Sequence, residues 1–263
     1  MKNATKLMTT ALALGLAVIA ASSAQATVLV SEGFSYANGN LVPNGGWANY
    51  SGAATDIQVV SGRAVGGGAS NPQNDDHKAF TAQPLTSKTY ACFEVMIPAV
   101  AAAPKAIYFA SLKDAGAANL VSRVYVLPVT GGFTCGISHS STSATVGVTA
   151  WSATSLSYNT PYNIVINYDP VAKSSKLWVN PVNELSTNVT DTNAAIAALA
   201  VSTFALRQTV TASTLPASPN YSGTADWTFS VDNVGVGTTF DDACFQVTPT
   251  NRSTWGQLKV IYR

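Results

Sequence analysis

Apolar and polar residues alternate with a period of two along most of this chain. Because successive side chains of a β-strand point to opposite faces, the pattern predicts strands rather than helices. The predicted strands are Asp56–Val60, Thr89–Ile97, Ala106–Leu112, Val121–Leu127, Phe133–His139, Tyr162–Tyr168, Lys176–Asn180, Phe204–Gln208 and Trp227–Val236. Glycine-rich and Asp-Pro turns separate them, and the internal helical candidate, Thr192–Leu199, is short. Many strands without a strand–helix rhythm predict an all-β protein, a two-sheet antiparallel sandwich.

The first 26 residues have the pattern of an export signal rather than of a folded element. A cationic start with Lys2 and Lys6 precedes an apolar run over residues 7–21, and Ala24-Gln25-Ala26 fits a signal peptidase site. The alternative, an uncleaved membrane anchor, needs roughly 20 apolar residues, and this run is shorter. We therefore expect a signal peptide at 1–26 and a mature protein that is secreted, extracellular or at the cell surface.

Composition supports an extracellular β protein. Of the 263 residues 47% are hydrophobic and 10% are charged, with 14 Lys and Arg against 13 Asp and Glu. This balance argues against a nucleic-acid-binding protein, which needs a basic surface. The apolar fraction argues against disorder, and no long apolar run follows the N-terminus, so we expect no membrane span in the mature chain. We expect one domain over 27–240 and a tail over 241–263.

Strand parity assigns four large side chains to the side of their strands that faces away from the core. They are Arg123, Tyr125, Trp178 and Arg207. Aromatic rings stack on the C–H faces of sugars, and guanidinium groups donate to hydroxyls or carboxylates. We therefore interpret the four residues as a candidate ligand-binding face on one sheet. The alternative is that loops cover these side chains and that Trp178 serves packing alone.

Groups suited to catalysis are scarce. The chain has three Glu and two His, and it contains no Gly-x-Ser-x-Gly, His-Glu-x-x-His or phosphate-loop motif. Glycosidases need two carboxylates about 5–10 Å apart across the scissile bond, and no segment places such a pair. The densest polar cluster, Asn74–His77, is interpreted as a solvated loop. We predict that the protein is not an enzyme.

Seven segments in order resemble laminin-G-like, concanavalin-A-type jelly rolls of secreted bacterial proteins. The segments are Ser31–Gly39 with Asn44–Trp47, Arg123–Val126, Phe133–Ser138, Tyr162–Tyr168, Leu177–Pro181, Phe204–Gln208 and Val231–Thr238. The resemblance covers about residues 27–240 and implies a jelly-roll sandwich. It also favours a lectin-like protein whose partner is a glycan or surface polysaccharide. The alternative function is a structural cell-surface or matrix protein that mediates contact or assembly.

The same resemblance implies a structural calcium ion where the first and last strands meet. The matching residues are Glu32 and Asp232, with backbone carbonyls near Gly45 or Gly46. Calcium prefers such carboxylate and carbonyl oxygens. The alternative is that both carboxylates cap strand ends at the surface.

Three cysteines, Cys92, Cys135 and Cys244, would enter an oxidising compartment after export. Cys135 takes the core side of its strand and Cys92 does not, so a disulfide between Cys92 and Cys244 is the pairing that fits best. Three reduced cysteines are the alternative.

The tail changes pattern after Phe240. Trp255, Leu258 and Ile261 recur at helical spacing within 253–263, which predicts a short C-terminal helix. Such a helix would either dock on the sandwich or serve as a sorting signal.

Overall fold

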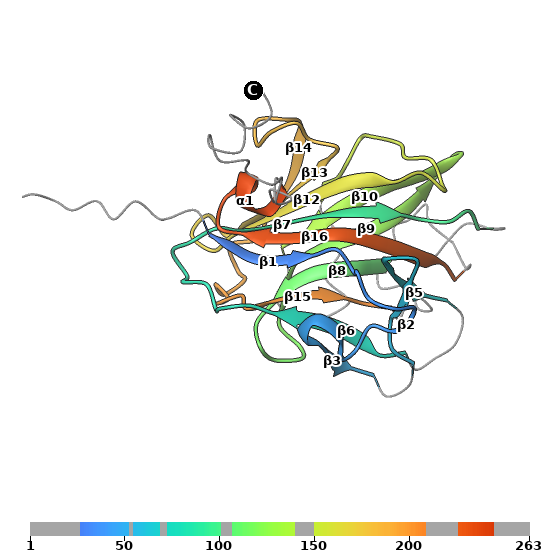
Figure 1. Ribbon diagram of the computed structural model, residues 1–263. Helices are drawn as coiled ribbons and strands as arrows, with labels where there is room; N and C mark the ends of the chain where they lie inside the picture. The colour runs from blue at the N-terminus through green and yellow to red at the C-terminus, as the bar shows by residue number, and fades with distance from the viewer. Residues whose placement is uncertain are drawn as a thin grey trace, which may run out of the picture.

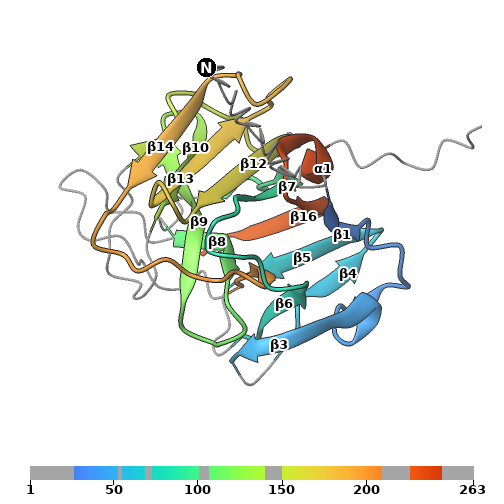
Figure 2. The ribbon, with the colours of Figure 1, turned by 90° about the vertical axis from the view of Figure 1, so that its left-hand side faces the viewer.

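The computed structural model describes residues 27–52, 55–68, 73–100, 107–139, 150–208 and 226–244. These residues form two antiparallel β-sheets that pack face to face (Figures 1 and 2), so the predicted all-β sandwich is confirmed. The predicted signal peptide and the predicted helix over 253–263 lie outside the described residues.

Sheet A contains the first and the last of the described strands. In spatial order its strands are β14 (Asn188–Thr192), β13 (Ser174–Val179), β12 (Tyr162–Asp169), β7 (Thr89–Met96), β16 (Thr228–Gly237), β5 (Arg63–Gly67), β4 (Gln58–Val60) and β2 (Gly39–Asn40). Strand β1 (Val28–Glu32) also pairs with β16. The first and last described strands therefore lie side by side, as Figure 1 shows.

Sheet B forms the opposite layer. In spatial order its strands are β11 (Ala150–Trp151), β10 (Gly132–Ser138), β9 (Leu120–Val129), β8 (Ile107–Lys113), β15 (Thr203–Leu206), β6 (Asp75–Ala79) and β3 (Trp47–Ser51). Consecutive strands such as β6 and β7, or β14 and β15, belong to different sheets. The chain therefore passes repeatedly between the two layers, as in a jelly roll.

Helical structure is short in the described part of the chain. It consists of the 3-10 turn η1 (Asn44–Gly46) and helix α1 (Phe240–Cys244). The helix expected over Thr192–Leu199 is absent, because Thr192 pairs with Ser174 in the sheet. Asn193 then closes a single turn by accepting hydrogen bonds from the backbone N–H groups of Ala195 and Ile196. None of the described helices has the length and apolar content to cross a bilayer.

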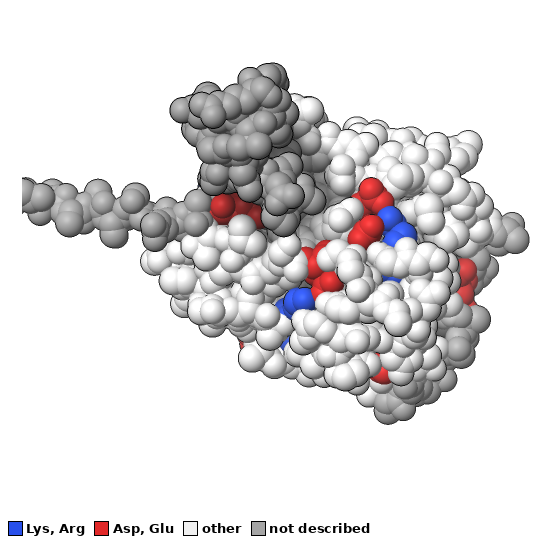
Figure 3. All heavy atoms as spheres, viewed as in Figure 1, with Lys and Arg blue, Asp and Glu red and all other residues white. Residues whose placement is uncertain are grey.

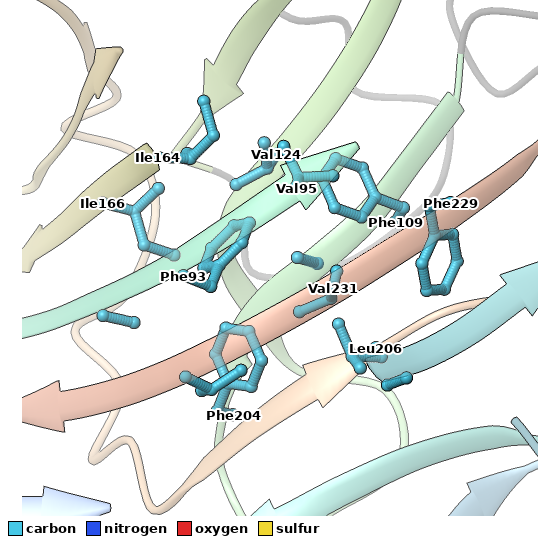
Figure 4. Packing of buried hydrophobic residues seen from close by; sticks show 14 of the residues in the cluster. Phe93, Val95, Phe109, Val124, Ile164, Ile166, Phe204, Leu206, Phe229 and Val231 are labelled. Carbon is cyan, nitrogen blue, oxygen red and sulfur yellow. The ribbon is translucent and has the colours of Figure 1, made fainter. Parts of the chain in front are cut away.

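The core fills the space between the sheets (Figure 4). Phe93 of β7 meets two rings of sheet B, with ring centroids 6.1 Å from Phe109 and 5.5 Å from Phe204. The inward residues predicted by parity are in this core: Val124, Val126, Phe133, Cys135, Ile137, Ile164, Ile166, Leu177, Phe204 and Leu206. The assignment of these side chains to the core from the period-two pattern is therefore confirmed.

The polar segment Asn74–His77 is not a solvated loop. Residues 75–79 form β6, which pairs with β3 on one side and β15 on the other. Asp76 lies fully buried and accepts hydrogen bonds from the Asn49 side chain at 2.7 Å and the Ile57 backbone at 3.1 Å. The prediction was wrong because polar side chains of this strand are buried with hydrogen-bond partners. The strand therefore lacks the apolar–polar alternation that a sequence pattern detects.

Candidate functional site

The four residues predicted to form one ligand face belong to different sheets. Arg123 and Tyr125 lie on β9, and Arg207 directly follows β15, so these three belong to sheet B. Trp178 lies on β13, whose partners β12 and β14 belong to sheet A. All four point away from the core between the sheets, as parity predicted, but the prediction of a single shared face was wrong. Parity assigns a side of a strand, whereas long-range pairing decides its sheet.

Trp178 is buried on the outer face of sheet A, where α1 covers it. Its side chain is 1% exposed, and its ring lies 5.6 Å from the ring of Phe240 in an edge-on contact. Its indole N–H donates to the backbone carbonyl of Glu184 at 3.2 Å. Figure 2 shows α1 over this face of the sandwich. The prediction that Trp178 is exposed to a ligand is therefore wrong, because α1 packs on this residue.

The outer face of sheet B carries what we call the basic–aromatic cluster. Its members come from five strands and the residue after β15: Tyr50, Asp75, His77, Tyr108, Lys113, Arg123, Tyr125, Trp151 and Arg207. Tyr108, Lys113, Arg123 and Tyr125 are buried, whereas Tyr50, His77, Trp151 and Arg207 keep part of their surface exposed. The cluster therefore has a rigid base and a partly accessible rim.

Three aromatic rings follow one register row across sheet B. Trp151 of β11 is opposite Gly136 of β10, Gly136 is opposite Tyr125 of β9, and Tyr125 is opposite Tyr108 of β8. The ring centroid of Tyr125 lies 6.4 Å from that of Trp151 and 5.6 Å from that of Tyr108. A Cβ atom at Gly136 would come within 2.4 Å of the Trp151 ring, so this glycine lets the indole lie against the sheet.

Two guanidinium groups share the ring of Tyr108. The guanidinium carbons of Arg207 and Arg123 lie 4.5 Å and 5.1 Å from its centroid, and that of Arg123 lies 5.8 Å from the Tyr125 centroid. Cation–π contacts of this kind hold the planar cations against the rings. Arg207 also approaches the carboxylate of Asp75, at 3.9 Å from its Nε. Aromatic faces and fork-shaped donors are thus held together on one surface.

A lysine and a histidine extend the cluster toward β6 and β3. The Lys113 ammonium contacts Nδ1 of His77 at 3.1 Å and lies 4.8 Å from the centroid of the Tyr50 ring. The His77 and Tyr50 rings stack with centroids 5.5 Å apart. Burial, together with the Lys113 charge, lowers the pKa of His77. An ammonium group can only donate, so His77 accepts at Nδ1 and carries its proton at Nε2.

Burial also sets the state of the phenols and of Lys113. It raises the pKa of Tyr125 to about 12 and the pKa of Tyr50 well above its usual value, although the positive charge of Arg207 opposes both shifts. Burial lowers the pKa of Lys113 against the opposing charge of Asp114. At neutral pH both phenols are therefore protonated and can donate a hydrogen bond.

Glu32 does not offer calcium an open carboxylate. Its Oε1 accepts the Phe34 backbone N–H at 2.7 Å, and its Oε2 accepts from Tyr36 at 2.8 Å, from Trp47 at 3.0 Å and from Lys78 at 2.5 Å. Burial raises the pKa of Glu32, but these hydrogen bonds outweigh it and leave the pKa below its usual value. The Lys78 ammonium supplies the positive charge that a metal would bring.

Asp232 likewise faces a protein cation. Arg63 contacts its carboxylate at 3.4 Å and that of Glu94 at 2.6 Å. No group of three or more metal-binding side chains occurs within the ranges that the structure describes. Figure 3 shows red and blue atoms side by side on a surface that is otherwise largely uncharged. Both carboxylates expected to bind calcium are therefore engaged in internal ion pairs, and the calcium site stays a prediction.

The predicted disulfide partners lie next to each other as free thiols. Cys92 on the outer face of β7 and Cys244 at the end of α1 share the small apolar cluster that includes Trp178 and Phe240. The hydrogen bond to Cys92 raises the pKa of the Cys244 thiol, and burial acts in the same direction. Cys135 is buried in the main core, as parity predicted. The structure thus brings together the pair that the sequence favoured.

Sequence analysis missed six members of the cluster: Tyr50, Asp75, His77, Tyr108, Lys113 and Trp151. Tyr108 stands between two core residues of a predicted strand, Ile107 and Phe109, so the parity rule applied there would have found it. Tyr50 and His77 lie in strands whose polar sequences gave no strand signal.

Comparison with known proteins places the fold but not a family. No family model and no curated protein matches the chain. The CBM2 module of the evolved Dit protein of Lactobacillus casei BL23 phage J-1 aligns with a TM-score of 0.53 and 10% identity, over 81% of this chain and 96% of the module. A sialidase aligns with a TM-score of 0.50 and 15% identity, over 83% of this chain.

These two likenesses show a shared β-sandwich fold. This chain spans about a fifth of the sialidase chain, since the alignment covers 19% of it. One fold can host binding modules and enzymes alike, so function has to be argued from the site. The narrower resemblance to laminin-G-like proteins stays a prediction.

Proposed function

We propose that this chain is a secreted, non-catalytic glycan-binding protein, and that the outer face of sheet B carries its binding site. The observation that supports this most directly is the register row of Trp151, Tyr125 and Tyr108 with two guanidinium groups against it. The half-buried indole of Trp151, at the end of this row, suits the C–H face of a sugar ring, and the guanidinium donors suit its oxygens.

The accessible rim determines which residues would touch a sugar. Trp151 is half-buried at one end of the row, and Arg207 is partly exposed near the other. The buried Tyr108 and Arg123 would fix these two side chains in place rather than contact the ligand. Such a rigid base lowers the entropy cost of binding.

The carboxylates support a role in binding rather than in glycoside hydrolysis. Asp75 is the acidic member of the cluster, and its Oδ1 already accepts the backbone N–H of Gln208 at 3.0 Å. Glu32 is held by Lys78, and Glu94 by Arg63. The acid–base pair that hydrolysis requires is therefore not assembled by the described residues on this face.

A glycan array with the mature chain, residues 27–263, tests the proposal. Trp151→Ala should weaken binding at least about tenfold, because stacking of an aromatic ring on a ligand is lost. Leu185→Ala is the matched control, since it truncates a side chain that is 94% exposed and lies in sheet A's β13–β14 loop. Equal binding by both variants, or release of sugar fragments by the wild type, would contradict the proposal.

A second candidate function, contact or assembly at a cell surface, has its own supporting observation. The β13–β14 loop exposes two apolar side chains, Val182 at 78% and Leu185 at 94%. Beside this loop a pocket of about 340 Å³ is lined by Asn183, Glu184, Leu185, Thr239, Phe240 and Asp241. If Leu185→Ser reduces self-association measured by analytical ultracentrifugation while no glycan binds, this second function is the better account.

A further inference from the structure

Several polar atoms on the outer face of sheet B are buried without a hydrogen-bond partner. Within the part of the chain that the structure describes, these include Arg207 Nη1, Tyr50 Oη, Tyr125 Oη and Ser138 Oγ. An unpaired buried donor is costly, so native proteins rarely leave several in one place. Their concentration on the face that already carries the aromatic row indicates that a ligand completes them.

Arg207 connects these unpartnered atoms. Its charge acts on both Tyr50 and Tyr125, opposing the rise of each phenol's pKa. Its guanidinium carbon lies 4.5 Å from the Tyr108 centroid, which is 5.6 Å from the Tyr125 centroid. Arg207 Nη1 and the protonated hydroxyls of Tyr50 and Tyr125 therefore place hydrogen-bond donors close together. A ligand that binds beside them should carry a hydrogen-bond acceptor.

The charge of the cluster selects the kind of acceptor. Lys113, Arg123 and Arg207 carry positive charge there, and Asp75 provides a carboxylate against Arg207, while Asp191 acts on Tyr125 from β14. The carboxylates of Asp75 and Asp191 offset part of this positive charge, and an anion on the rim beside Arg207 would offset more of it. A guanidinium also matches the two oxygens of a carboxylate or sulfate group.

We propose that the basic–aromatic cluster binds an acidic saccharide, with Arg207 receiving the carboxylate or sulfate and the Trp151 side of the row receiving the sugar ring. This inference rests on the proposed glycan-binding function and narrows it to a charge class. Tyr50, which belongs to the partly accessible rim, donates to the anionic group or to a neighbouring hydroxyl. The buried Arg123 adds to the positive potential without contacting the sugar.

Pairs of polysaccharides that differ in charge alone test the proposal. Suitable pairs are polygalacturonate with its methyl ester, hyaluronan with its carboxyl-reduced form, and dextran sulfate with dextran. Binding of the mature chain is measured by affinity electrophoresis and calorimetry at two salt concentrations. We expect binding to at least one acidic member, at least about tenfold loss in its neutral partner, and weaker binding at higher salt. The pair that responds distinguishes a carboxylate from a sulfate.

Substitutions at Arg207 place the anionic group. Arg207→Gln should reduce acidic-glycan affinity at least about tenfold, and Arg207→Lys should recover part of it, since the charge returns without the two-pronged donor. Lys176→Gln, which removes one positive charge from β13 in sheet A, is the matched control and should bind as the wild type. Tyr50→Phe removes one hydroxyl alone and keeps the test valid if Arg207→Gln fails to fold.

The outcomes separate the two proposals. Binding to neutral members with no preference for acidic ones would overturn the acidic-saccharide inference and leave the glycan-binding function standing. Acidic-glycan binding that Arg207→Gln and Tyr50→Phe both leave unchanged would also overturn it. Absence of binding across all pairs and across the glycan array would overturn both proposals.

Discussion

Asp76 is a buried acid whose environment favours its neutral form. Burial raises its pKa to about 7, against the hydrogen bonds from Asn49 and Ile57 that favour the carboxylate. The folded protein therefore holds this proton more tightly than the unfolded chain. Its contribution to stability is fully present below the unfolded pKa of about 4 and is lost as pH rises through the folded value near 7.

Asp76→Asn tests this assignment. The free energy of unfolding of the variant relative to the wild type should rise between pH 4 and pH 8, by up to about 4 kcal/mol, because the amide cannot ionise. Denaturant titrations of both proteins at several pH values measure the difference. A difference that stays constant with pH would contradict the raised pKa.

Glu32 and Lys78 illustrate the opposite case, a buried charge stabilised by its partners. Their side chains are 3% and 16% exposed, and Tyr36, Trp47 and Phe34 add donors to the same carboxylate. Lys78→Met should destabilise the protein by about 3 kcal/mol, because it leaves the carboxylate buried without its cation. Urea denaturation measures this loss.

Calcium provides the control for the same site. If Lys78 replaces a metal at Glu32, the Tm of the wild type should be equal in excess calcium and in chelator. A Tm that rises with calcium would show that a cation binds to the folded state and would support the calcium prediction.

Among the elements, strands with an apolar core side were predictable and polar strands were not. β7, β10 and β12 begin and end within one residue of their predicted bounds, because their inward positions are consistently apolar. By contrast β6 and β14 have the sequences DDHKA and NVTDT. Their inward polar side chains are satisfied by partners distant in sequence, such as Lys78 with Glu32, and a local pattern cannot contain that information.

Helix α1 and the outer face of sheet A form a second, smaller packing layer. Phe240 of α1 contacts Trp178 and Tyr90, with ring centroids at 5.6 Å and 6.3 Å. The Tyr90 hydroxyl donates to the Glu184 carboxylate at 2.6 Å, while Trp178 donates to the carbonyl of the same residue. The β13–β14 loop and α1 are therefore both anchored through these two rings.

Trp178→Ala should for this reason act on stability. We expect a loss of about 3–5 kcal/mol in the free energy of unfolding, the usual cost of truncating a buried large aromatic side chain. Glycan affinity of the folded fraction should stay at the wild-type value, because Trp178 lies in the other sheet from the basic–aromatic cluster. Leu185→Ala, at an exposed position of the β13–β14 loop, should change the free energy of unfolding by less than about 0.5 kcal/mol. Wild-type stability combined with lost binding would return Trp178 to a ligand site.

For the whole molecule, the arrangement of strands into sheets decides which outward residues become neighbours. Parity placed Arg123, Tyr125, Trp178 and Arg207 correctly on outward sides, yet β13 joins sheet A while β9 and β15 join sheet B. Three of the predicted residues thus lie against Tyr108, and the fourth lies against α1. Pairings between residues far apart in sequence set this outcome, so part of the candidate site was predictable and its assembly was not.

The same long-range closure predicts that one disulfide forms if the protein is exported to an oxidising compartment. Cys92 lies on β7 in the middle of sheet A, and Cys244 ends α1 with its thiol hydrogen-bonded to Cys92. In an oxidising compartment this pair should form a bridge that stabilises the fold by about 2–4 kcal/mol, since it closes a long loop of the unfolded chain. Cys135 should stay reduced, because it is fully buried in the core and burial raises its pKa to about 12.

Alkylation in denaturant without reductant, followed by peptide mass spectrometry, measures the outcome directly. One alkylated cysteine at position 135 and a linked peptide containing Cys92 and Cys244 are expected. A reductant should then lower the Tm of the wild type and of Cys135→Ala, whereas Cys244→Ser should melt at one temperature with or without it. Alkylation of all three cysteines in protein purified from an oxidising compartment would show that the thiols stay free, and α1 would then be held to sheet A by Trp178, Tyr90 and Phe240 alone.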